Sequence, residues 1–141
     1  MSNKLLLSQE FTIYLTPFDE VAHELAKQAE ESGQTIVHCS YVSKHKYIFG
    51  GWVNIWPTTY LVDENDSVHL PLLHAERVPL APQKHYFQEP GQLLSFTLHF
   101  PGIPKNWNQF SFKEIVSGGK KGFEVQTIYR NNVGVYHIEL K

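Results

Sequence analysis

A lone cysteine beside a histidine is the first feature of this sequence that could do chemistry. Cys39 follows His38, with His45 a few residues later, and a thiol next to an imidazole base can act as a nucleophile. Neighbouring residues of a strand point to opposite faces, however, so His38 would not face Cys39. The thiol shares its expected face with Val37 and Tyr41, and free cysteine is among the most buried residue types. The pattern therefore predicts that Cys39 is buried in the core and inert.

Histidine is frequent in this chain, and it is a common metal ligand. The eight histidines lie at positions 23, 38, 45, 69, 74, 85, 99 and 137, and no two have the spacing H-x-H, H-x-x-x-H or H-E-x-x-H. His69 and His99 both fall on expected outer strand faces, where a pair could meet across a sheet. Zinc needs three or four converging ligands, so we expect neither a metal site nor a cofactor.

An acidic segment resembles the opening of a calcium loop. It runs Asp63-Glu64-Asn65-Asp66-Ser67, with oxygen ligands at alternate positions. Val68 stands where such a loop requires glycine, and His74 stands where it requires a bidentate glutamate. The segment is therefore predicted to be a hairpin turn.

Other local signatures of catalysis are also missing from the sequence. There is no G-x-S-x-G nucleophile elbow, no P-loop and no G-x-G-x-x-G motif. Carboxylates from distant positions could still converge in the folded chain. We therefore predict a protein that is not an enzyme and name no catalytic residues.

The aromatic residues are the best candidates for a binding site. Trp52, Trp56 and Trp107 could form a stacking platform for a sugar or a protein partner. The alternative is that these rings pack in the core, because a buried ring removes about 150 Å² or more of surface from water. Trp52 and Trp56 alternate with Val53 and Ile55, and either set could face the core.

Composition limits the class of protein. The 141 residues suit a single domain, 1–141, and the net charge of −2 with no dense basic stretch argues against nucleic acid as partner. The densest cationic patch, residues 118–122, has the composition of an exposed turn. Cys39 is the only cysteine, so no intrachain disulfide can form. No apolar run is long enough to span a membrane, and the sequence as written indicates the cytoplasm, or export if a leader has been removed.

One helix is predicted, near the N-terminus. A strand is expected at residues 10–15, followed by a helix at residues 17–32. Thr16 suits the N-cap, Pro17 suits the first helical position, and Gly33 suits the C-terminal stop. The apolar residues between them recur at helical spacing, so this helix would lie over a sheet.

The rest of the chain shows the two-residue period of strands. Strands are expected from residue 35 to 41, 47 to 56 with a bend at Gly50-Gly51, 58 to 62, 67 to 73, 93 to 100, 110 to 115, and in a final hairpin of 123 to 130 with 135 to 140. Residues 76–91 hold three prolines and are expected to form a long surface crossover. This pattern predicts a mainly β fold, an immunoglobulin-like antiparallel β-sandwich, with a closed barrel as the alternative.

Five segments between residues 52 and 115 resemble a poorly characterised β-sandwich module of Bacteroidetes proteins. They are Trp56-Pro57-Thr58-Thr59-Tyr60-Leu61-Val62-Asp63, residues 73–82, His85-Tyr86-Phe87, residues 96–104, and residues 110–114. The resemblance implies an immunoglobulin-like fold, often in exported proteins, and carries no catalytic residues. The chain departs from the module in having Arg77-Val78 where a Gly-Ile pair is common.

Two functions follow as hypotheses. The first is a non-catalytic binding module for a protein, peptide or glycan, with Trp52, Trp56 and Trp107 as the candidate binding residues. The second is a small hydrolase-like enzyme whose site is assembled from distant residues. The surplus of large rings also predicts an aromatic surface that docks a partner or forms a homodimer.

Overall fold

The computed structural model describes residues 33–141, so the strand predicted at 10–15 and the helix predicted at 17–32 lie outside the described residues. Ten strands and one short 3₁₀ helix make up the described part. They are β1 (Gln34–Val42), β2 (Trp52–Val53), β3 (Tyr60–Asp63), β4 (His69–Pro71), β5 (His74–Glu76), β6 (His85–Tyr86), β7 (Leu93–Pro101), β8 (Gln109–Val116), η1 (Ser117–Gly119), β9 (Lys120–Tyr129) and β10 (Val135–Leu140).

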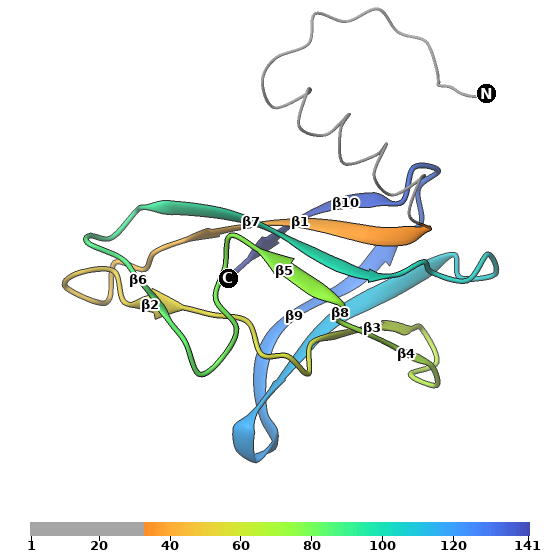
Figure 1. Cartoon of the computed structure of the whole chain (residues 1–141), viewed down its shortest axis with the longest axis horizontal. Coiled ribbons are helices and arrows are strands. Elements are labelled where there is room, and N and C mark those ends of the chain that lie inside the picture. The colour runs from red at the N-terminus through yellow and green to blue at the C-terminus, as the bar shows by residue number, and fades with distance from the viewer. Residues whose placement is uncertain (1–32) are drawn as a thin grey trace, which may run out of the picture.

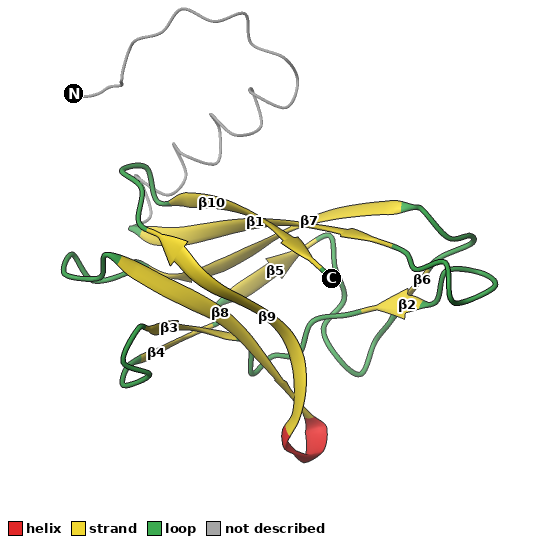
Figure 2. Ribbon diagram, turned by 180° about the vertical axis from the view of Figure 1, so that it is seen from behind, coloured by secondary structure: helices red, strands yellow, loops and turns green. Residues whose placement is uncertain are grey.

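Two four-stranded sheets form the body of the molecule. One has the order β10-β1-β7-β5 and the other the order β4-β3-β8-β9, with β2 and β6 forming a small third sheet. Figure 1 shows the two large sheets one above the other, with β2 and β6 at one end. Figure 2, seen from behind, shows the β8–β9 pair reaching away from the body to the turn at η1.

Alternation along β1 and β7 decides which face of the first sheet is buried. Val37 and Cys39 of β1 pair with Leu98 and Phe96 of β7, and all four are fully buried. This confirms the predicted faces, with Tyr41 also buried and His38 on the opposite side. Successive side chains of a strand point to opposite faces, so a strand with one face on a core has apolar residues at every second position.

Rings from both sheets interlock in the core. Phe100 of β7 meets Phe112 of β8 edge to face, with ring centroids 6.2 Å apart, and Phe110 meets Tyr136 at 4.9 Å. Such perpendicular contacts add to the area the rings remove from water. The described chain is thus mainly β and built of packed sheets, as predicted, while the immunoglobulin-like class stays a prediction.

The strand predicted at residues 47–56 is wrong in most of its length. Only Trp52–Val53 forms a strand, and residues 44–49 form a turn-rich loop. Gly50 and Gly51 both have positive φ, 88° and 77°, a conformation that interrupts pleated backbone. The diglycine therefore ends the loop instead of bending a continuous strand.

The predicted final hairpin and the wholly antiparallel sheet are also wrong. β9 pairs with β8, whereas β10 crosses to the other sheet and runs parallel to β1, with Ile36 opposite Val135 and Tyr41 opposite Leu140. The segment 131–134 looks like a hairpin turn in sequence, but the Asn131 side chain holds it in another shape. Its Oδ1 accepts the amides of Val133 and Gly134, and its Nδ2 donates to the Val135 carbonyl.

The proline-rich segment 76–91 joins β5 to β7, which are antiparallel neighbours in one sheet, so the predicted crossover is wrong, and the segment is not only a surface loop. It contains β6 and buries Val78 and Phe87 in the core. Its Leu80 also forms a parallel bridge with Ile55. No helix among residues 33–141 is long and apolar enough to cross a bilayer.

Candidate binding surface

The structure separates the three tryptophans that the sequence grouped together. Trp107 is 7% exposed and belongs to the core, whereas Trp52 is 46% exposed. Trp56 is half-buried, and its backbone amide is bound by a buried carboxylate. Val53, Asn54 and Ile55 are all buried, so the two tryptophans do not share a continuous exposed face. Only Trp52 therefore remains a strong candidate for contact with a partner.

Most of the surface around Trp52 was not predicted from the sequence. Tyr86 lies opposite Trp52 in the β2–β6 pair and is 68% exposed. The preceding loop adds Tyr47, Ile48 and Phe49, which are 49%, 85% and 69% exposed. We call these five residues, Tyr47, Ile48, Phe49, Trp52 and Tyr86, the loop-end surface. Three consecutive apolar residues between a polar segment and a diglycine were the available signal.

The base of this loop is tied firmly to the segment before β7. Ser43 lies at the centre, because its hydroxyl donates to the Glu89 carbonyl at 2.7 Å and accepts the Gln92 amide at 2.8 Å. The backbone of Ser43 also bonds to Gln92 and Gly91. The loop thus holds its shape without help from the side chains of Ile48 and Phe49.

Two lysines lie over rings of the loop-end surface. The Lys84 ammonium lies 4.4 Å from the centre of the Trp52 ring, and that of Lys46 lies 5.2 Å from the Tyr47 ring. Lys44 stands over Tyr41 at 5.8 Å. Cations held over ring faces are attracted by the electrons of the ring. The surface therefore combines exposed rings with positive charge.

Figure 1 shows the loop between β1 and β2 at one end of the longest axis of the described chain. The β1–β7 register places Val42 opposite Leu93 at this end, and both residues are more than half exposed. The loop-end surface thus lies at the tip of the molecule, where a partner can approach without meeting the sheets.

The outer face of the β10-β1-β7-β5 sheet gathers four of the histidines. His74 lies opposite His99, and His38 lies opposite His137, with ring centroids 5.5 Å and 5.4 Å apart. We call His38, His74, His99 and His137 the histidine face. His69 does not join it, since it stacks on Tyr60 of the other sheet with ring centroids 4.2 Å apart, so the possible pair of His69 with His99 does not form.

Carboxylate and hydroxyl groups link the histidine face. Glu76 Oε2 lies 2.9 Å from His99 Nε2 and 3.9 Å from His74 Nε2. Thr97 Oγ1 accepts a bond from Arg77 at 3.1 Å and lies 3.2 Å from His38 Nδ1. Among residues 33–141, no group of three or more His, Cys, Asp or Glu side chains is placed to hold a metal ion.

Burial and neighbouring charge both lower pKa values in the pair formed by His38 and His137. Burial lowers the pKa of His38, and the neighbouring His137 and Arg77 lower it further. Burial also lowers the pKa of His137. Both rings are therefore held neutral to lower pH than a free imidazole.

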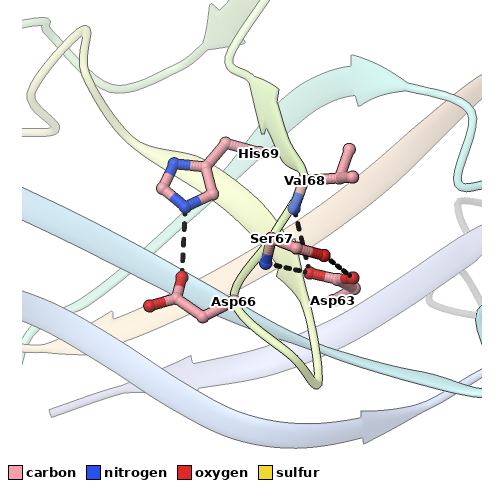
Figure 3. Close-up of polar contacts among 5 residues, drawn as sticks. All are labelled: Asp63, Asp66, Ser67, Val68 and His69. Atoms are coloured by element: carbon pink, nitrogen blue, oxygen red, sulfur yellow. Dashed lines mark hydrogen bonds and ion pairs between the residues drawn. The ribbon is translucent and has the colours of Figure 1, made fainter.

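The acidic segment forms the β3–β4 hairpin turn, which confirms the prediction. Figure 3 shows Asp63 turned back into its own loop, where its carboxylate accepts the Ser67 hydroxyl at 2.7 Å and the amides of Ser67 and Val68. These bonds lower the pKa of Asp63, the Ser67 hydroxyl most. Asp66 lies 3.1 Å from His69. The Asp63 carboxylate thus stabilises the hairpin turn.

Cys39 is fully buried, which confirms the prediction for this residue. Its Sγ lies 3.8 Å from the Val37 carbonyl oxygen, within its own strand. Burial raises the pKa of the thiol far above its ordinary value. The thiol is therefore protonated at neutral pH and poorly suited to attack a substrate.

No protein-family model, curated protein or solved structure matches this chain. The resemblance of residues 52 to 115 to the Bacteroidetes module accordingly stays a prediction.

Proposed function

We propose that the chain is a non-catalytic binding module that docks a partner through the loop-end surface. One observation carries the proposal: five large apolar side chains are exposed together at one tip of the molecule. Exposing contiguous apolar surface is unfavourable in water, so such surfaces commonly mark contact sites. Their exposure is not needed for the shape of the loop, which Ser43 and its partners hold.

A defined ligand panel tests this proposal. The full chain and its Phe49→Ser variant would be offered to immobilised oligosaccharides, synthetic peptides and lipid vesicles. Tyr129→Ser is the matched control, because Tyr129 is 70% exposed and lies outside the loop-end surface. We expect at least one ligand class to bind the wild type and the control, and to lose affinity for Phe49→Ser. Binding that is equal for all three proteins, or absent throughout, would refute the proposal.

The partner at the loop-end surface could also be a second copy of the same chain, which would give a homodimer. Sedimentation at micromolar concentration would show a dimer for the wild type and a monomer for Phe49→Ser. A dimer that persists in Phe49→Ser would place the contact elsewhere on the chain.

The second candidate function is hydrolysis at the histidine face. The observation that favours it is the carboxylate of Glu76 within reach of two imidazoles, since a carboxylate beside histidine orients and tunes an acid–base catalyst. The His74 ring is 65% exposed and would meet the substrate. Hydrolysis of simple esters or phosphoesters that disappears in both His74→Gln and Glu76→Gln would support this function. Turnover that both variants retain would exclude it.

A further inference from the structure

The apex of the loop-end surface is hydrocarbon in character. Ile48 is the most exposed of the large apolar side chains in the described part of the chain, at 85%, and its neighbour in sequence, Phe49, is 69% exposed. Tyr47, Trp52 and Tyr86 are also exposed, and their rings carry polar groups. Purely hydrocarbon side chains accompanied by Tyr and Trp suit a membrane surface, where amphipathic rings prefer the headgroup level.

The loop presents this apex on a fixed base. The Gly50 amide donates to the Tyr47 carbonyl at 3.1 Å, and the Phe87 amide donates to the Gly51 carbonyl at 3.0 Å. A side chain on Gly51 would meet the Tyr47 ring at 2.9 Å, so the ring is held close against the backbone. Because the base is already ordered, insertion of the apex would require little further ordering of the loop.

The charge around the apex is opposite in sign to that of the chain. Residues 43–52 and 83–93 contain Lys44, Lys46 and Lys84 against the single acid Glu89, a local charge of +2. The whole chain carries −2, so the remainder carries −4. Basic residues next to exposed apolar ones are attracted to anionic lipid headgroups. The charge therefore complements the surface of a bilayer that contains anionic lipid.

We propose that the loop-end surface inserts into the interfacial layer of a bilayer containing anionic lipids, with Ile48 and Phe49 among the acyl chains and the three lysines at the headgroups. This inference rests on the proposed binding function and names its partner. Insertion at an interface is distinct from spanning the membrane and needs no apolar helix.

The shape and chemistry of the tip favour a bilayer over other partners. A stable protein interface buries about 800 Å² on each partner, more than a tip of five side chains offers, whereas lipid can close around a protruding loop. A sugar stacks on an open ring face, but Lys84 occupies one face of Trp52 and Ile48 offers no ring.

Co-sedimentation with vesicles tests the inference on the full chain. The vesicles are phosphatidylcholine alone and phosphatidylcholine mixed with phosphatidylserine. We expect binding to the mixed vesicles that weakens with added salt, because electrostatic attraction to the surface is screened. Lys44→Gln and Lys46→Gln should each reduce the partition coefficient about fivefold. Phe49→Ser should reduce it about tenfold or more, since a buried phenyl ring is lost.

The controls are exposed apolar residues that lie elsewhere on the chain. Tyr129→Ser and Val133→Ser remove exposed apolar side chains outside the loop-end surface, and both should bind vesicles as the wild type does. Thermal unfolding of each variant establishes that it is folded. Trp52 supplies a second readout, because its fluorescence should shift to the blue on insertion, and the shift should vanish in Trp52→Phe.

The outcomes separate this inference from the proposed function. Absence of binding to the mixed vesicles, or equal binding by Phe49→Ser and the wild type, overturns the membrane inference. If an oligosaccharide, a peptide or a second copy of the chain then binds in a way that depends on Phe49, the proposed function stands with another partner. If nothing binds in that way, both fail.

Discussion

Glu114 shows how one residue can join three parts of this fold. Its side chain is buried on β8, where Oε2 accepts the Trp56 amide at 2.8 Å and Oε1 accepts the Phe123 amide at 3.0 Å. Gly122 leaves the space for it, because a side chain there would collide with the carboxylate. A buried polar group must be bonded to be tolerated, and here each oxygen has a partner.

Replacing this carboxylate by an amide should destabilise the fold. Glu114→Gln keeps one acceptor oxygen, so either the Trp56 or the Phe123 amide would face an NH₂ group. We expect the free energy of unfolding to fall by about 1–3 kcal/mol, as for a buried donor left unpaired. Denaturant titration measures this loss, and Glu139→Gln, at an exposed position of β10, is the control with little change.

The difference in free energy of unfolding between the wild type and Glu114→Gln should also depend on pH. Burial raises the pKa of Glu114 above its ordinary value of 4.5, while the two amide bonds act in the opposite direction. The folded state therefore holds its proton more tightly than the unfolded state does. The stability of the wild type relative to Glu114→Gln should decline as pH rises from about 4.5 through the raised pKa, and then level off. A relative stability that increases over this range would contradict the assignment.

The thiol of Cys39 should be protected in the native protein. It is fully buried and protonated, so reaction with a thiol reagent has to await opening of the structure. We expect labelling at neutral pH to be slow in buffer and fast in denaturant, as followed by absorbance of the released chromophore. Rapid labelling of the folded chain would mean an accessible thiolate and would strengthen the enzyme hypothesis.

At the scale of elements, local alternation predicted the strands better than it predicted their partners. The face of β8 follows from every-other-residue burial, and so does the second half of β1, whereas β7 is buried on both faces at Phe96–Phe100 and is recognised by its apolar alternation in sequence. The partner of β10 depends instead on contacts with β1, far away in the chain. The loop-end surface was missed for a related reason, because an apolar triplet resembles a buried strand until Gly50 and Gly51 are seen to end it.

The loop that carries the apex should depend on Gly50. Its φ of +88° disfavours any side chain, and a Cβ there would lie 2.5 Å from the Glu89 carbonyl oxygen. Gly118 has a similar φ of +82° but open space around it, so Gly118→Ala isolates the backbone effect, about 1 kcal/mol. We expect Gly50→Ala to lower the free energy of unfolding by about 1–3 kcal/mol more than Gly118→Ala does, because the added methyl group overpacks the contact with Glu89. Equal losses in denaturant titration would show that the contact with Glu89 is easily relieved.

At the scale of the whole molecule, β10 closes the first sheet. It lies at the edge of the order β10-β1-β7-β5, and its Tyr136, Ile138 and Leu140 belong to the core. Without it, the backbone of β1 would be an open edge and one side of the core would be uncovered.

A chain cut before Val135 should therefore fail to reach the native state. We expect loss of the cooperative thermal transition and aggregation at micromolar concentration. Removing Lys141 alone, which is exposed and follows the strand, is the control and should leave the transition in place. A truncated chain that still unfolds cooperatively would show that β1 is adequately covered by β7.

The parallel pairing of β1 and β10 also affects how the chain can fold while it is being synthesised. After β1, a ribosome must make residues 43–134 before it reaches the parallel partner Val135–Leu140. Chains grow at about 5–20 residues per second, far slower than local structure forms, so the nascent β1 spends seconds with one edge unsatisfied. Codon choice and chaperone access over that interval, as much as native stability, would then set the yield of folded protein in a cell.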